Sequence, residues 1–146
     1  NFDANTDLIY SKCQKRLFFL RKLRHLNVDA SILCTFYRCF IESVLTFSFM
    51  SFFGGLSVKN KSKLNRVVNI GSKIVGERQS GLNELYERRV KAKGARIAAD
   101  VSHNLAAKYE LMPSRRRYRV PLYRTLRSQR AFVPMSIKLL NTDLNR

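Results

Sequence analysis

The sequence predicts a mainly α-helical protein that ends in a basic, irregular segment. Through the first 100 residues, apolar side chains recur at steps of three and four, the period of helices with one buried face. After Asp100 that period is lost, prolines stand at positions 113, 121 and 134, and arginines accumulate. We therefore expect a four-helix bundle over residues 1–100. A basic segment over residues 101–146 would pack on the bundle or trail from it.

Polar residues and glycines bound the first two predicted helices. The first helix begins near Thr6 and runs to about Asn27, and Asp29 or Ser31 can cap the second through a side-chain oxygen. The second continues to Gly54-Gly55, where a glycine can adopt the left-handed conformation that ends a helix.

The second helix is apolar on nearly every side, which makes it the expected central element. Four of its residues should be buried among at least three helices: Phe40, Ile41, Val44 and Leu45. A membrane span needs about 20 predominantly apolar residues, and Arg38 and Glu42 interrupt this stretch. The sequence therefore favours a buried helix over a membrane helix.

Serines and glycines also bound the remaining helices. Ser57 should cap a third helix that Gly76 stops, and Ser80 should open a fourth. Gly71 and Gly94 lie inside these two helices, where glycine costs about 1 kcal/mol relative to alanine. We interpret both as points of close backbone approach.

Two shorter helices are expected in the C-terminal segment. One would span Ser102 to Tyr109, and Pro134 would start the other. Four residues of that last helix offer an apolar patch that can dock on the bundle: Met135, Ile137, Leu139 and Leu140.

The net charge of +18, from 28 Lys and Arg against 10 Asp and Glu, favours a polyanionic partner. Nucleic acid is our first choice and an anionic membrane surface the second. The predicted phosphate contacts on helices are Lys12, Lys15, Arg16, Lys59, Lys63, Arg66, Lys73, Arg89, Lys93 and Arg96.

The C-terminal segment has no acidic residue from Leu111 to Thr142 and adds further candidates. They are Arg115, Arg116, Arg117, Tyr118, Arg119, Tyr123, Arg124, Arg127 and Arg130. Guanidinium groups match phosphate oxygens two at a time, and tyrosine rings can stack on unpaired bases. Structured or single-stranded RNA should therefore be preferred over plain duplex DNA. The competing interpretation is a solvated loop whose charges only keep the chain soluble.

No catalytic or metal-binding motif emerges from the sequence. It has no glycine-rich phosphate loop, no Gly-x-Ser-x-Gly elbow, no His-x-Asp pair of iron oxygenases and no Tyr-x-Asp-Asp pair of polymerases. The three cysteines and two histidines lack the spacing of a zinc site. Ser102-His103 is the only suggestive dyad, and sequence neighbours seldom form a reacting pair. We expect no cofactor, no metal and no enzyme activity from this chain alone.

Six stretches of sequence together carry a resemblance to a known family. They are Leu8–Arg24, Phe36-Tyr37, Ile41–Ser48, Gly71–Gly76, Pro113–Leu122, and Phe132–Pro134 followed by Ile137, Leu139, Leu140 and Asn141. In this order they resemble the region after the palm of LINE-type (non-LTR) retrotransposon reverse transcriptases.

The resemblance implies the thumb and C-terminal region of such a polymerase. The bundle would be thumb-like and would grip RNA or the template–primer hybrid, with the fingers and palm upstream as partners. The catalytic aspartates would lie in the absent palm, and the location would be nuclear and cytoplasmic. Asn1 in place of an initiator Met fits a piece of a longer protein.

Two other interpretations remain open. The chain could be a free-standing basic adaptor that docks on an acidic protein or membrane surface through its Phe-rich helix. It could also be a fragment of an alkylation-repair oxygenase, against which the missing iron ligands argue. Phosphate binding through six to ten contacts should weaken by about 10³–10⁵ between 50 and 200 mM salt, whereas hydrophobic docking should barely change.

Overall fold

The structure, a computed structural model, describes residues 2–143. Within that range the chain is mainly helical and forms no strand beyond one isolated bridge between Leu111 and Tyr118, which confirms the predicted fold class. It divides into two compact units, Asn1–Leu82 and Asn83–Arg146.

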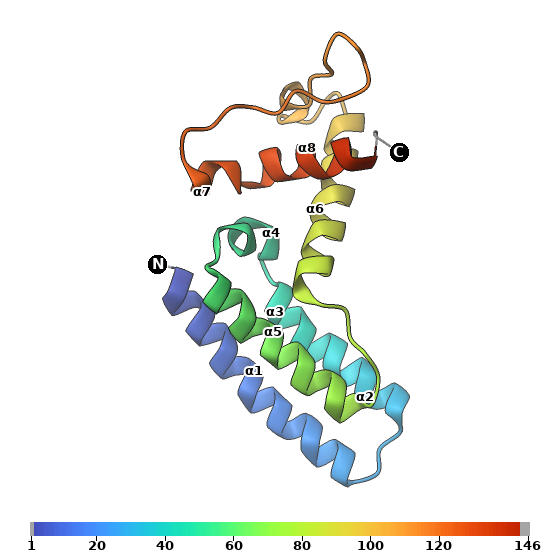
Figure 1. Cartoon of the computed structure of the whole chain (residues 1–146). Helices are drawn as coiled ribbons and strands as arrows, with labels where there is room; N and C mark the ends of the chain where they lie inside the picture. The colour runs from blue at the N-terminus through green and yellow to red at the C-terminus, as the bar shows by residue number, and fades with distance from the viewer. Residues whose placement is uncertain (1, 144–146) are drawn as a thin grey trace. The chain divides into compact units, whose positions relative to one another are not determined.

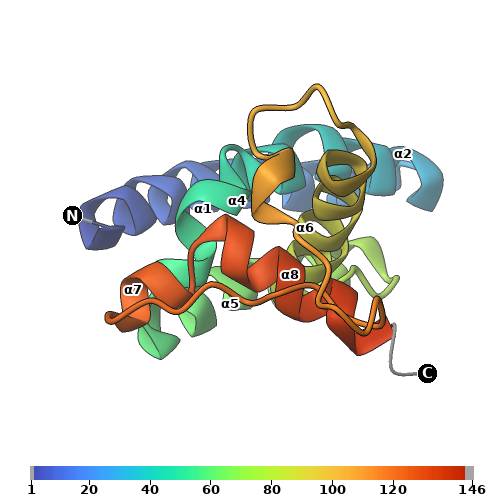
Figure 2. The same ribbon diagram turned by 90° about the horizontal axis from the view of Figure 1, so that it is seen from above.

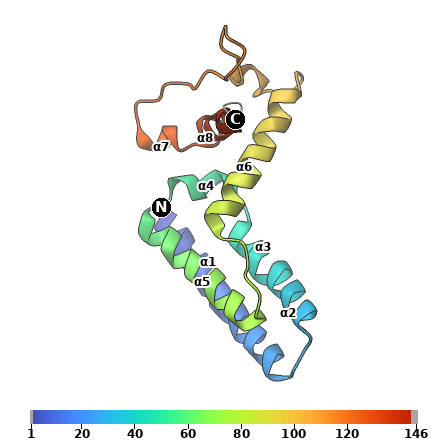
Figure 3. The same cartoon turned by 45° about the vertical axis from the view of Figure 1, so that its right-hand side comes forward.

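The first unit is built on two long helices. Its elements are α1 (Phe2–His25), α2 (Ala30–Phe36), a π-helix (Tyr37–Glu42), α3 (Ser43–Thr46), α4 (Phe49–Phe52), a 3₁₀ turn (Phe53–Gly55) and α5 (Val58–Val75). Helices α1 and α5 lie side by side (Figures 1 and 3), and the run from α2 to α3 packs against them. The residues between them are fully buried and almost all apolar, among them Leu17, Leu33, Leu45 and Leu64.

The second predicted helix is broken in the structure. The π-helix at Tyr37–Glu42, called the π-turn below, has a wider turn than the α-helices on either side of it. Further along, the backbone of Phe47 is extended. Ser48 then adopts the left-handed conformation, with φ 50°. The expected left-handed residue at Gly54-Gly55 was wrong, because these glycines belong to the 3₁₀ turn.

The π-turn also changes which residues are buried. Ile41 and Leu45 are fully buried as predicted, Val44 is half-buried, and Phe40 is 51% exposed. Burial of Phe40 was therefore a wrong prediction. A regular helix would turn 100° per residue, whereas the wider π-turn rotates Phe40 out of the core.

Ala30–Gly55 is the one helical run in residues 2–143 that is long and apolar enough to cross a membrane. Its most apolar 18-residue window has a mean hydropathy of 1.4, and a third of that window is buried. The same run supplies Leu33, Ile41 and Leu45 to the core, so core helices of a soluble protein explain its composition equally well. The expectation of no membrane partner stays a prediction.

Two of the predicted helix ends in the first unit are confirmed, and the predicted cap of α2 is not. Ser57 Oγ accepts a hydrogen bond from Asn60 N at 3.2 Å, and Gly76 ends α5 with φ 84°, as predicted. Asp29 occupies the N-cap position before α2, but its carboxylate accepts from Ser31 Oγ at 2.7 Å and caps no backbone amide.

The second unit holds α6 (Leu82–Ala99), a 3₁₀ turn (Ala106–Lys108), α7 (Leu126–Gln129) and α8 (Phe132–Asp143). The first residue of α6, Leu82, is the last residue of the first unit. Helix α8 runs across α6 (Figure 1; Figure 2 shows the same helices from above), and a small core joins Ile97, Tyr109 and Ile137. We placed the domain boundary at residue 100. The structure divides the chain at residue 82, because α6 shares its core with α8.

Other expectations for the second unit hold only in part. The predicted fourth helix begins at Leu82 and not at Ser80, and the short helix of residues 102–109 shrinks to the 3₁₀ turn. The last helix begins at Phe132 with Pro134 in its first turn. Of its predicted docking residues, Ile137 is fully buried and Met135, Leu139 and Leu140 are half-buried.

Gly71 and Gly94 are points of close approach, as the sequence predicted. A Cβ atom on Gly71 would lie 2.7 Å from Cδ2 of the Tyr37 ring. One on Gly94 would lie 2.7 Å from the Cβ of Ser136. In both cases a side chain makes the approach, so each glycine is required by packing within its own unit.

Candidate nucleic-acid interface

The arginine-rich segment, residues 111–130, begins as a short hairpin in the second unit. Met112 N donates to the Arg117 carbonyl and Arg119 N to the Glu110 carbonyl, both at 2.8 Å. Arg115 sits at the tip with φ 53°, a left-handed conformation that is uncommon outside glycine. Arg115 and Arg116 at this tip are both exposed.

A polar clamp anchors this hairpin to α8. Tyr118 N donates to Asn141 Oδ1 at 2.8 Å, and Asn141 Nδ2 donates to the Tyr118 carbonyl at 3.0 Å. The Tyr118 ring meets Tyr109 edge-on, with ring centres 6.1 Å apart. The predicted stacking role of Tyr118 is untested, but its ring is half-buried and engaged in packing.

Tyr109 completes this anchor inside the core. Its hydroxyl lies 2.7 Å from Ser136 Oγ, which itself donates to the Val133 carbonyl at 2.8 Å. Since the serine proton goes to Val133, the tyrosine hydroxyl donates to the serine. Burial raises the pKa of Tyr109, and the hydrogen bond to Ser136 opposes that rise.

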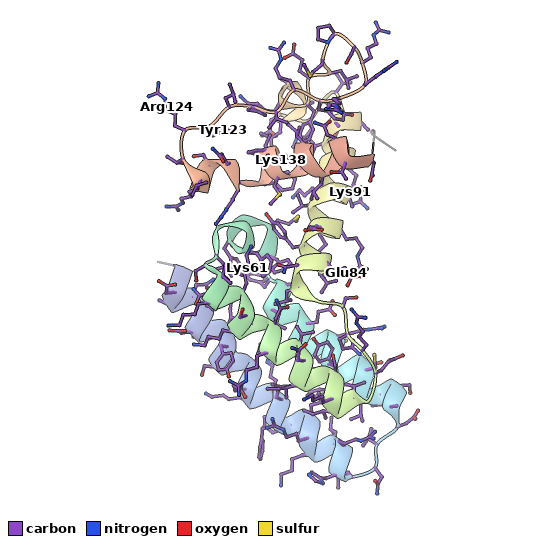
Figure 4. All side chains as sticks on the ribbon, viewed as in Figure 1. Lys61, Glu84, Lys91, Tyr123, Arg124 and Lys138 are labelled. Carbon is purple, nitrogen blue, oxygen red and sulfur yellow. The ribbon has the colours of Figure 1, made fainter. Side chains whose placement is uncertain are left out.

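All seven arginines of the segment are exposed. Arg119 lies 3.7 Å from Glu110, and both side chains are more than half exposed, so this ion pair is weak. Figure 4 shows Tyr123 and Arg124 on the extended stretch that leads into α7, with Arg124 pointing away from it. The Tyr123 carbonyl accepts from Gln129 Nε2 at 3.0 Å, and the Tyr123 ring is 36% exposed. Tyr123 is therefore the better placed of the two predicted stacking residues.

The predicted basic residues of α6 belong to the same unit. Arg96 and Lys93 are exposed, and Arg89 is half-buried. Lys93 Nζ lies 6.0 Å from the centre of the Phe132 ring. Lys91, which was not among the predicted candidates, forms an ion pair with Asp143, the last residue of α8.

The remaining candidates lie in the first unit. Lys59, Arg66 and Lys73 of α5 are exposed. Lys63 Nζ instead pairs with Asp7 at 2.6 Å and sits 4.8 Å from the centre of the Tyr10 ring, so its charge is partly compensated. The structure therefore groups the helical candidates by unit, with the α1 and α5 residues in the first and the α6 residues in the second.

The α1 candidates border a feature that sequence reasoning missed. Lys12, Lys15 and Arg16 line a groove of about 990 Å³ together with Phe40 and other apolar residues. Arg16 donates a guanidinium hydrogen bond to the Phe40 carbonyl. The groove depends on the π-turn, for which the sequence gives no clear signal.

Ser102 and His103, the one suggestive catalytic dyad, form hydrogen bonds within their own loop and not with each other. Ser102 Oγ donates to Asp100 Oδ1 at 2.6 Å, and these hydrogen bonds lower the pKa of Asp100. His103 Nδ1 accepts from Leu105 N at 3.1 Å. The serine proton therefore points to the carboxylate and not to the imidazole, which is not the geometry of a nucleophile and its base.

The three cysteines differ in burial. Cys13 and Cys34 are buried, Cys39 is exposed, and all three are free. Burial raises the pKa of Cys13 to about 11, so this thiol stays protonated and unreactive at neutral pH. Within residues 2–143, no group of three His, Cys, Asp or Glu side chains is arranged to hold a metal ion.

The fold and the exposed arginines define a small basic helical protein of two units. A family model described as alkylated DNA repair protein alkB homolog 8, N-terminal, matches residues 2–43. This stretch covers α1, α2 and the π-helix, which is under a third of the chain. Comparison with curated proteins and with solved structures gave no match.

This match corrects the retrotransposon resemblance. The stretch Leu8–Arg24, the longest of the six, lies wholly inside residues that match a different family. The identification as the thumb of a LINE-type reverse transcriptase, with a palm and fingers upstream, was therefore wrong. The adaptor alternative has no support either.

The expectation that this chain alone is not an enzyme agrees with a match to an N-terminal region. The further expectation that it is a polymerase fragment has no support.

Proposed function

We propose that this chain is a non-catalytic module that binds nucleic acid, mainly through the arginine-rich segment. One observation carries the proposal: seven exposed arginines stand on a segment that has no acidic residue from Leu111 to Thr142 and is anchored to a folded core. Planar guanidinium groups bind phosphate oxygens in pairs. A fixed scaffold lowers the entropy that binding would otherwise cost.

Two further observations support a nucleic-acid ligand. The matching family model is named for the repair of alkylated DNA, so nucleic acid is the substrate class in that protein's printed name. The net charge of +18 raises the local concentration of any polyanion. RNA and DNA both fit, and an intracellular location, nuclear and cytoplasmic, follows as part of the proposal.

The experiment compares two variants that lose the same charge. In one, Arg115 and Arg116 at the hairpin tip are changed to Gln; in the other, Arg21 and Arg24 of α1 are changed to Gln. All four side chains are exposed, and the α1 pair is outside the proposed interface. Binding of the intact chain to an RNA hairpin and to duplex DNA is measured by fluorescence anisotropy between 50 and 200 mM salt.

We expect the tip variant to reduce the slope of log Kobs against log salt by about 1 for each lost phosphate contact, on both ligands. The α1 variant should leave the slope nearly unchanged. Equal losses in the two variants would mean that binding is diffuse attraction to a positive chain, which would contradict the assignment to the arginine-rich segment.

A further inference from the structure

The groove of the first unit runs between α1 and the helical run that contains the π-turn. Its apolar wall includes Leu8, Phe19, Phe40, Val44 and Phe47. Of these, Phe19, Phe40 and Phe47 are 58%, 51% and 77% exposed. Three exposed phenylalanines around one groove form an apolar surface that is uncommon on a soluble protein without a binding role.

Two departures from regular helix geometry build this groove. The π-turn carries Cys39 and Phe40 to its wall, and the break at Phe47-Ser48 forms another part of it. π-turns are frequently found at functional sites, and a serine in the left-handed region is held there at a cost in free energy. Both irregularities thus expose rings that a straight helix would have placed elsewhere.

The polar part of the wall is positive. Lys12 and Lys15 are exposed, and Arg16 is held in place by the neutral carbonyl of Phe40, which leaves its charge uncompensated by that contact. The lining residues include no Asp or Glu. An occupant must therefore bring negative charge as well as flat or apolar surface.

Phe40 has the geometry of a stacking platform. Phe36 covers one of its faces, with ring centres 4.7 Å apart and planes 28° from parallel. Phe40 is nevertheless 51% exposed, so ring surface that Phe36 does not cover is accessible to a ligand. A second copy of this chain would bring a further +18 charge, and a duplex would hide its base faces, so neither fits this surface.

We propose that this groove binds single-stranded nucleic acid, with bases stacked on Phe40 and Phe19 and phosphates on Lys12 and Lys15. The inference rests on the proposed function in taking nucleic acid as the ligand. It adds a second binding surface, in the first unit, that is selective for unpaired strands because only these offer open base faces.

The test replaces single rings with leucine, which keeps apolar volume but removes the stacking face. Phe40→Leu and Phe19→Leu change the groove. Phe18→Leu is the matched control, since Phe18 lies on the same helix as Phe19, is 52% exposed and does not line the groove. Affinities of the intact chain for an oligo-dT strand, an oligo-rU strand and a duplex DNA are measured at one salt concentration. Circular dichroism and thermal melting confirm that each variant is folded.

We expect Phe40→Leu to weaken binding of both single strands by about tenfold and to change duplex binding by less than twofold. Phe19→Leu should have the same pattern with a smaller loss, and Phe18→Leu should bind like the unchanged chain. Unchanged single-strand affinity in folded Phe40→Leu, or an equal loss in Phe18→Leu, would overturn the inference.

Two further measurements distinguish a failure of the proposed function from a failure of the groove assignment. If the Arg115 and Arg116 variant keeps its affinity while Phe40→Leu loses single-strand binding, the proposed function fails at its own site and the groove assignment stands. If an acidic amphipathic peptide binds the unchanged chain but not Phe40→Leu, while single strands bind both equally, the groove belongs to a protein partner and the inference is overturned.

Discussion

The two units solve the same packing problem at different scales. In the first, Gly71 on a long helix admits the ring of the fully buried Tyr37, within a large apolar core. In the second, Gly94 admits the short side chain of Ser136, beside a cluster formed by the buried residues Ile97, Tyr109 and Ile137. The second unit compensates with polar contacts, including the Asn141 clamp and the Tyr109–Ser136 hydrogen bond.

The two units therefore support their proposed binding surfaces in different ways. A large apolar core makes the first unit tolerant of surface irregularities such as the π-turn. The small second unit holds a long basic segment in place with directional hydrogen bonds, which fix the backbone of the segment although little apolar surface is buried. Four predictions test this contrast, in order of expected effect.

The largest effect is expected from Leu45→Ala. Leu45 is fully buried in the first unit, so its truncation should lower the free energy of unfolding by about 2–5 kcal/mol. Phe40→Ala is the control, because Phe40 is 51% exposed, and its cost should be only about 1 kcal/mol. Urea unfolding followed by circular dichroism measures both. Equal costs would place Phe40 in the core and contradict the π-turn.

Gly71→Ala should be next in size. Its Cβ would overlap the fully buried Tyr37 ring, so we expect a cost towards the upper end of the range of about 1–3 kcal/mol for overpacking, above the gain of about 1 kcal/mol in helix propensity. Gly81→Ala is the matched control, since nothing lies within 4 Å of a Cβ there. Thermal melting should drop clearly for Gly71→Ala alone. A stabilised Gly71→Ala variant would show that the ring moves freely and that the contact is loose.

Alkaline pH should destabilise the first unit. Burial raises the pKa of Cys13 from 9.0 to about 11, so above pH 9 the folded state holds a proton that the unfolded state releases. Its stabilising contribution is complete below pH 9 and is lost as the pH rises towards 11, up to roughly 2 kcal/mol. Burial raises the pKa of Tyr37 in the same direction.

The control for this titration is the exposed thiol. Unfolding is measured from pH 7 to 11 in Cys13→Ala and in Cys39→Ala, under reducing conditions. The slope of stability against pH should flatten only in Cys13→Ala. An equal slope in all three chains would assign the alkaline loss to the tyrosines.

The last effect is expected from Gly94→Ala, at about 1–2 kcal/mol, because its Cβ would overlap the Cβ of Ser136 and the two helices would have to separate slightly. The loss should be confined to the second unit. Hydrogen exchange should show faster exchange in α8 and in the arginine-rich segment, with α1 and α5 unchanged. Equal acceleration of α1 would mean that the units unfold together.

Much of the fold follows from local sequence. The helical period, the Ser57 cap and the Gly76 stop were all predicted, because each depends on residues a few positions apart. The close approach at Gly71 was predicted from the glycine itself, but its partner, Tyr37, was not. The basic, acid-poor character of residues 111–142 was equally visible. The resemblance drawn from longer stretches was wrong, since the longest of them lies inside a match to another family.

The amino-acid sequence was sufficient to predict that this protein is helical and strongly basic. The structure was needed to show that a π-turn exposes Phe40, that Ser48 and not a glycine takes the left-handed conformation, and that the Tyr118 ring packs on Tyr109. It also moved the boundary between units to residue 82. These features depend on contacts between residues far apart in the chain. A period of three or four residues predicts a helix's buried face, but it does not predict where packing will add a residue to the turn.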